Sequence, residues 1–89
     1  MVGQLESYLD HLYAKGFKLS ASDIKFIYFG KQITAASDYT VRLAIEYTLK
    51  LTYGFDGSFF VNLLEHLDEQ KITKRHEVEA YLKVKNMIE

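Results

Sequence analysis

The chain contains no proline, and its apolar residues recur at helical spacing along almost its whole length. Apolar positions three and four residues apart line one face of an α-helix. Without proline, helices must end at glycines and begin at capping side chains. The glycines stand at positions 3, 16, 30, 54 and 57, and four of them fall where an apolar stripe stops. This pattern predicts an all-α fold, a compact bundle of about five short helices.

The N-terminal segment predicts a first helix over about 4–15. Its amphipathic stripe consists of Leu5, Tyr8, Leu9, Leu12 and Tyr13. Gly16 follows the stripe, and a glycine there can adopt the left-handed conformation that closes many helices. We therefore expect the first helix to end just before Gly16.

A second helix is expected over about 21–30. Ser20 is a candidate N-cap with Asp23 in the first turn, where the helix dipole favours an anion. The run IKFIYFG that follows is rich in residues with high strand propensity, so residues 24–34 could form either a helix or a strand. The cap upstream and Gly30 downstream favour a short helix.

The second half of the chain predicts three further helices, over about 38–53, 57–70 and 74–88. Residues 31–37 are expected to be a connection, with Ser37 as an N-cap. The apolar face of the helix that follows is broad, which is typical of a central, buried helix. Thr73 is expected to cap the last helix. Its inner face would consist of Val78, Tyr81, Leu82 and Ile88.

The stretch YGFDGSFF, residues 53–60, separates two of these helices. Gly54 could close the first helix and Asp56 could cap the second. Phe55 would then precede the cap and Phe60 would occupy the fourth helical position, the pair that forms a hydrophobic staple. The alternative is a G-x-x-G clamp on nucleic-acid backbone, but a carboxylate in the clamp would repel phosphates. We therefore interpret the stretch as a helix–helix joint.

Composition limits the functional classes. Eighty-nine residues make a single domain, 1–89, and a hydrophobic content of 48% predicts a packed core. The absence of cysteine excludes a disulfide framework and a thiolate metal site. No signal peptide or membrane-spanning run is visible, so a cytoplasmic location is expected. The formal net charge of −1 gives no global basic field for nucleic acid.

No catalytic signature emerges from the sequence. The G-x-S-x-G elbow, the phosphate loop and the dinucleotide fingerprint are all missing. The three histidines, His11, His66 and His76, stand in no metal-binding spacing. We therefore expect a non-enzymatic protein without metal or cofactor.

A local basic cluster is the one charged feature with a functional interpretation. It comprises Lys71, Lys74, Arg75, Lys83 and Lys85. Cations in the first turn of a helix are disfavoured by a few tenths of a kcal/mol, which favours a role for those near position 74. The cluster predicts contact with DNA or another anion, although charge runs are often only a solvated face.

From Val41 onward the pattern resembles the C-terminal helical domain of DnaD-like bacterial replication proteins. The segment RLAIEYTLK matches the family's alanine-rich helix, and Phe59, Leu63 and Leu67 occupy its aromatic-x3-aliphatic-x3-Trp motif. Ile72 and the later HEVEAYL continue the match. Upstream, FKLSASDIKFIYF loosely resembles a helix start of that family. The family's tyrosine is replaced by Phe59 and its tryptophan by Leu67, which removes base stacking at the latter position.

The resemblance implies a helical module that is accessory to DNA replication, acting through protein contact and weak DNA contact. The alternative is a protein–protein interaction or oligomerisation module with no nucleic-acid role. Seven tyrosines and six phenylalanines are many for so small a domain to bury, and an exposed aromatic patch marks a partner surface. A protein partner or self-association is therefore expected under both interpretations.

Overall fold

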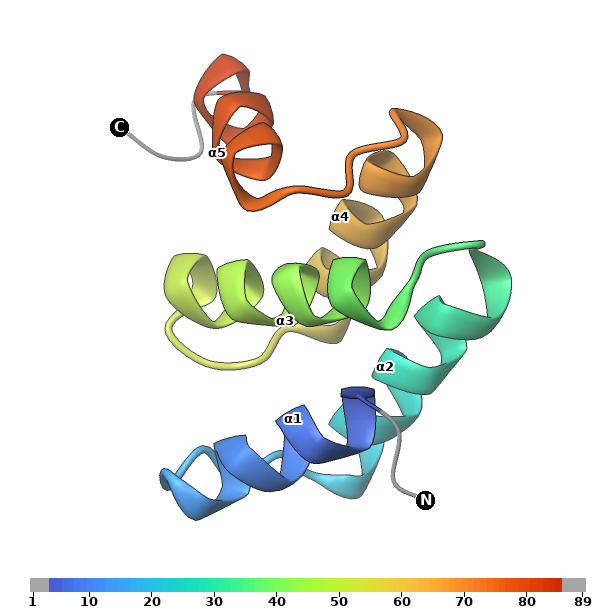
Figure 1. The fold of residues 1–89 in the computed structure, drawn as a ribbon. Coiled ribbons are helices and arrows are strands. Elements are labelled where there is room, and N and C mark those ends of the chain that lie inside the picture. Colours follow the sequence, from blue (N-terminus) through green and yellow to red (C-terminus); the bar gives the residue numbers. More distant parts are fainter. Residues whose placement is uncertain (1–3, 86–89) are drawn as a thin grey trace.

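The structure, a computed structural model, describes residues 4–85 and contains no strand among them. The described part of the chain is five helices joined by short connections (Figure 1). These are α1 (Gln4–Ala14), α2 (Ala21–Ile33), α3 (Asp38–Thr52), α4 (Gly57–Glu69) and α5 (Arg75–Val84). The predicted all-α bundle is confirmed, and residues 24–34 are helical up to Ile33. The predicted end of the last helix, including Ile88, lies outside the described residues.

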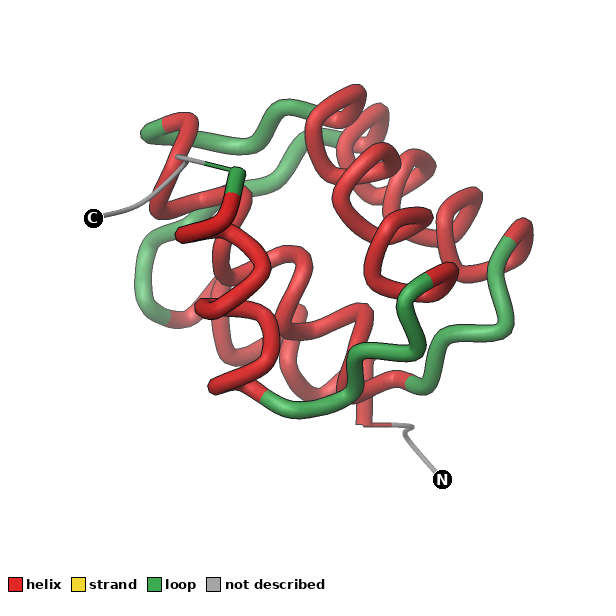
Figure 2. Tube along the Cα trace, turned by 90° about the horizontal axis from the view of Figure 1, so that it is seen from above, coloured by secondary structure: helices red, strands yellow, loops and turns green. Residues whose placement is uncertain are grey.

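Helix α3 lies in the middle of the bundle, with α1 along one side and α5 on the other (Figure 1). Helices α2 and α4 pack against each other and against α3. Viewed from above, the connecting loops run around the outside of the helices (Figure 2). The arrangement follows from the breadth of the apolar face of α3, which needs neighbours on several sides.

One contiguous core joins all five helices. Helix α3 supplies more buried side chains than any other described helix, which confirms the prediction that it is the central one. The buried apolar residues are Leu5, Leu12, Ile27, Val41, Leu43, Ala44, Ile45, Tyr47, Phe60, Leu63, Leu64, Leu67, Val78 and Leu82.

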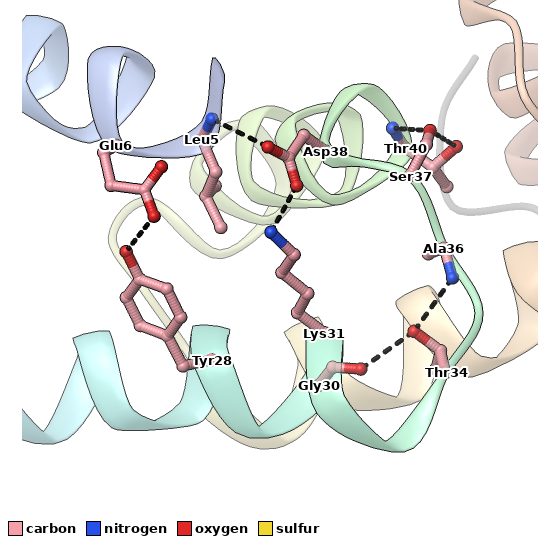
Figure 3. Close-up of polar contacts among 10 residues, drawn as sticks. All are labelled: Leu5, Glu6, Tyr28, Gly30, Lys31, Thr34, Ala36, Ser37, Asp38 and Thr40. Atoms are coloured by element: carbon pink, nitrogen blue, oxygen red, sulfur yellow. Dashed lines mark hydrogen bonds and ion pairs between the residues drawn. The ribbon is translucent and has the colours of Figure 1, made fainter. Parts of the chain in front are cut away.

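Helix α2 continues one turn beyond its predicted end. Gly30 lies inside the helix and is buried, because the backbone of α2 approaches α4 closely at this point. A Cβ built on Gly30 would lie 3.0 Å from atoms of both Leu64 and Phe60. The helix ends instead at Ile33, where the Thr34 hydroxyl donates to the Gly30 carbonyl over 2.9 Å (Figure 3). The prediction that residues 31–33 belong to a connection is therefore wrong, since this glycine serves packing and not termination.

The predicted helix caps before α2 and α3 are confirmed. The Ser20 hydroxyl accepts from the Asp23 amide over 3.0 Å, and the Asp23 carboxylate accepts from the Ser20 amide over the same distance. The Ser37 hydroxyl accepts from the Thr40 amide at 3.3 Å. Gly16 closes α1 with a φ of +97°, as predicted. These bonds use donors and acceptors that the helix ends would otherwise leave unpaired.

The joint at residues 53–60 is confirmed except for one glycine. The Asp56 carboxylate accepts from the backbone of α4, and the rings of Phe55 and Phe60 lie 5.4 Å apart as a hydrophobic staple. The left-handed residue after α3, however, is Tyr53, with a φ of 56°, and not Gly54. The Thr52 hydroxyl donates to the Gly54 carbonyl over 2.6 Å. This hydrogen bond lies within the turn that follows α3, where the left-handed residue comes one position earlier than predicted.

The turn between α4 and α5 also differs from its prediction. Lys74, and not Thr73, occupies the N-cap position of α5. The Glu77 carboxylate accepts from the amides of both residues, over 3.3 Å from Thr73 and 3.2 Å from Lys74. Because the Glu77 carboxylate accepts from these two amides, the turn needs no threonine hydroxyl at the N-cap.

Candidate functional site

Arg75, a member of the predicted basic cluster, is occupied by an ion pair. Its two terminal nitrogens donate to the two carboxylate oxygens of Glu46 on α3, one of them over 3.2 Å. The hydrogen bonds that Arg75 donates to Glu46 raise the pKa of Arg75 above its ordinary value. Next to this pair the Tyr47 hydroxyl donates to Glu79 over 2.7 Å. Arg75 therefore fastens α5 to α3 through a paired contact with Glu46 at a partly exposed junction.

The other four residues of the predicted cluster are exposed lysines that fall into two groups. Lys71 and Lys74 stand before α5, whereas Lys83 and Lys85 stand at its far end. Lys74 and Lys85 flank the ten residues of α5, a length of about 15 Å. Lys85 also lies 5.9 Å from the ring centre of Tyr81. The structure does not gather the cluster into one patch, and DNA contact stays a prediction for these lysines.

The three positions of the DnaD-like motif lie largely inside the protein. Leu63 and Leu67 belong to the core, and Phe59 is half-buried. Phe59 and Leu63 also line a recess of about 400 Å³ between α4 and α5, together with His66 and Tyr81. There the Tyr81 hydroxyl lies 2.9 Å from His66 Nδ1. At these positions burial accounts for the apolar spacing.

The outer side of α2 exposes large apolar side chains. Phe26, Phe29 and Ile33 are 39%, 52% and 47% exposed and stand at spacings of three and four residues. We call this strip, with the flanking Ser22 and Lys25, the α2 face. The opposite side of the helix is anchored, because Ile27 and Gly30 are buried against the bundle. The Phe26 ring is packed so tightly on the backbone at Gly57 that a Cβ there would overlap the ring.

A cleft of about 320 Å³ lies between α1 and α3. We call it the α1–α3 cleft. Its lining consists of Tyr8, His11, Leu12, Lys15, Phe17, Arg42, Glu46, Leu49 and Lys50. Apolar side chains and cationic head groups therefore share one concave surface, with Glu46 as its carboxylate.

The electrostatics of this cleft centre on Arg42 and Glu46. The Arg42 guanidinium lies over the Tyr8 ring, 5.0 Å from its centre, and its Nε is buried without a hydrogen-bond acceptor among residues 4–85. Burial acts to raise the pKa of Glu46, but the hydrogen bond from Arg75 and the charges of Arg75, Lys50 and Arg42 lower it overall. Burial, with the nearby Glu46 charge, raises the pKa of the Tyr8 phenol. Glu46 is thus held as a carboxylate and directed to Arg75.

Sequence reasoning predicted exposed aromatics without identifying them, and it missed the cleft altogether. The segment IKFIYFGKQI indicates the α2 face, because it carries apolar residues on nearly all sides of the helix. A helix that buries a single face needs fewer apolar residues than this. The signal for the cleft is weaker. His11 and Lys15 are one turn apart and Arg42 and Lys50 two turns apart, which places each pair on one side of its helix.

Two kinds of feature are absent from the described residues. Residues 4–85 contain no group of three or more histidine, aspartate or glutamate side chains arranged to hold a metal ion. None of the helices described is long and apolar enough to cross a membrane.

Comparison with known proteins gives one result. No curated protein and no solved structure matches the chain. A family described as a family of unknown function (DUF6123) matches residues 1–88, nearly the full length. The chain therefore belongs to the DUF6123 family of unknown function.

Proposed function

We propose that this protein is a non-enzymatic interaction module that self-associates through the α2 face. The observation that carries the proposal is the exposure of Phe26, Phe29 and Ile33 side by side on one helix. Contiguous exposed apolar surface of this kind marks interaction sites on small soluble domains. Burying it would contribute roughly 25 cal/mol for each Å² removed from water.

Contacts within the chain hold α2 and the Phe26 ring in place. Ile27 and Gly30 fix the inner side of α2, and the contact of Phe26 with Gly57 limits the freedom of that ring. A rigid surface loses little conformational entropy on association, so more of the burial energy remains as affinity. The anchoring of α2 therefore supports the interpretation that its exposed apolar side chains bind a partner and are not a loosely packed part of the core.

A second copy of the chain is the partner we propose. Lys25 is the one charged residue of the α2 face, and the formal net charge of −1 produces little repulsion between copies. A twofold axis needs only one self-complementary surface. An antiparallel pairing centred near Phe29 sets Phe26 of one copy opposite Ile33 of the other and leaves Lys25 at the rim.

Sedimentation equilibrium over about 10 µM to 1 mM tests this proposal, a range that spans weak self-association. We expect a monomer–dimer equilibrium for the wild-type protein. The double substitution Phe29→Ser with Ile33→Ser should weaken the dimer at least tenfold, because it removes the centre of the contact. Circular dichroism should show unchanged helix content, since both side chains are already exposed.

Val84→Ser is the matched control, because Val84 is 78% exposed on α5 and not on the α2 face. It should leave the equilibrium unchanged. A wild-type protein that remains monomeric at the highest concentration would overturn the proposal. So would a dimer that Val84→Ser weakens as strongly as the double substitution does.

A further inference from the structure

The α1–α3 cleft is distinct from the α2 face and plays no part in the proposed self-association. Its volume of about 320 Å³ is at the lower end of the range for small-molecule sites, roughly 300–1,000 Å³. Such sites combine a mostly apolar lining with a few polar groups that fix the orientation of the ligand. The lining of the α1–α3 cleft has this composition.

Positive charge in the cleft exceeds negative charge. Lys15, Arg42 and Lys50 are cations, whereas Glu46 is the single carboxylate of the lining. Glu46 is already engaged by both terminal nitrogens of Arg75, which approaches it from α5. The three cations of the lining form no ion pair with any residue between 4 and 85. The cleft is therefore a local basic site on a nearly neutral protein.

Arg42 is the cation best placed to bind a ligand. Its guanidinium is held over the Tyr8 ring by a cation–π contact at 5.0 Å, which limits the orientations that it can adopt. Its Nε is buried and has no hydrogen-bond acceptor among the described residues. A guanidinium presents its donors in a planar fork that matches the oxygens of a carboxylate or a phosphate.

The apolar part of the lining sets the second requirement. Leu12, Leu49 and Phe17 offer hydrocarbon surface beside the charged groups. A fully hydrated inorganic anion would leave this surface unused, whereas an anion with a hydrocarbon body would cover it. From these contacts we propose that the α1–α3 cleft binds a small amphipathic organic anion, with its carboxylate or phosphate head on Arg42 and its apolar body against Leu12, Leu49 and Phe17.

Amide chemical-shift mapping on ¹⁵N-labelled protein tests this site. The probes are octanoate and octyl phosphate, which share a tail and differ in head group, and octanamide as the neutral counterpart. We expect octanoate or octyl phosphate to shift the amides of Leu12, Lys15, Arg42 and Leu49, with a Kd of about 1 mM or tighter, a value reasonable for so small a ligand. Octanamide should bind at least tenfold more weakly, because it leaves the cations unpaired. The stronger of the two anions identifies the head group.

Arg42→Gln should weaken binding of the better anion at least tenfold, because it removes the fork but keeps much of the side-chain length. The combined change Lys15→Gln with Lys50→Gln, at two exposed positions, gives the same test without altering Arg42. Lys25→Gln removes the same charge from the α2 face and should leave the affinity within about twofold.

Three results would overturn the inference. The first is the absence of shifts in the cleft with either anion at about 5 mM, well above the expected Kd. The second is equal binding of octanamide and octanoate, and the third is a set of shifts confined to the α2 face. Chemical shifts report on each residue separately, so binding in the cleft is measured independently of self-association through the α2 face.

Discussion

The carboxylate of Asp38, in the first turn of α3, accepts a hydrogen bond of 3.3 Å from the backbone amide of Leu5, in the first turn of α1 (Figure 3). The two residues are 33 positions apart. The same carboxylate forms an ion pair with Lys31 of α2. One side chain at the start of α3 therefore caps α1 and holds α2, and an amide that the start of a helix leaves unpaired finds its acceptor in another helix.

Asp38→Ala should lower the free energy of unfolding by about 1–2 kcal/mol, the range for loss of a helix-capping acceptor. Lys31→Gln removes only the partly exposed ion pair and should cost no more than about 0.5 kcal/mol. Urea unfolding followed by circular dichroism measures both changes. Equal losses for the two variants would show that the ion pair, and not the cap, stabilises the contact.

Acid should weaken the junction between α3 and α5. Burial opposes ionisation of Glu46, but the hydrogen bond from Arg75 holds the pKa of Glu46 below its ordinary value in the folded protein. A carboxyl group with a lowered pKa stabilises the fold above its unfolded pKa, and this stability is lost as the pH falls through the folded value. The wild-type protein should therefore lose stability below about pH 4.5 more steeply than Glu46→Gln. Urea midpoints at neutral pH and at several acidic pH values measure this difference. Parallel pH profiles for the two proteins would contradict the prediction.

Lys71→Gly should stabilise the protein by about 0.5–1 kcal/mol, because Lys71 has a φ of 54° and a side chain in this region is strained. For a domain of this size that gain raises Tm by roughly 2–8 °C. Lys74→Gly is the matched control, since Lys74 has an extended backbone with a φ of −122°. It should give no gain. A rise in Tm for Lys74→Gly as large as that for Lys71→Gly would rule out relief of strain as the cause.

Gly30→Ala should destabilise the protein, although alanine is by far the better helix former. The added Cβ would lie 3.0 Å from side-chain atoms of Leu64 and Phe60, both fully buried. Overpacking costs about 1–3 kcal/mol, whereas the better helix propensity of alanine contributes about 1 kcal/mol. The free energy of unfolding should therefore fall, by up to about 2 kcal/mol. Gly54→Ala meets nothing within 4 Å and should change stability by less than about 0.5 kcal/mol. Thermal unfolding of both variants tests the contrast, and a more stable Gly30→Ala protein would contradict it.

The sequence by itself determined where most of the helices begin. Ser20, Ser37 and Asp56 each accept from an amide only three residues ahead. The staple of Phe55 on Phe60 spans five residues. Interactions of such short range depend on neighbours along the chain, and the pattern of residue types reveals them before any fold is known.

Tertiary structure alone decided the features that depend on distant partners. Gly30 follows the pattern of a helix end, yet it lies within α2 because Phe60 and Leu64 approach it from α4. Arg75 belongs to a basic cluster in the sequence, yet it is paired with Glu46, 29 positions away. The exposure of Phe29 and the cleft around Arg42 arise in the same way. Which glycine permits a close approach, which cation is neutralised and which aromatic meets solvent all depend on how helices pack, and helical periodicity does not specify that packing.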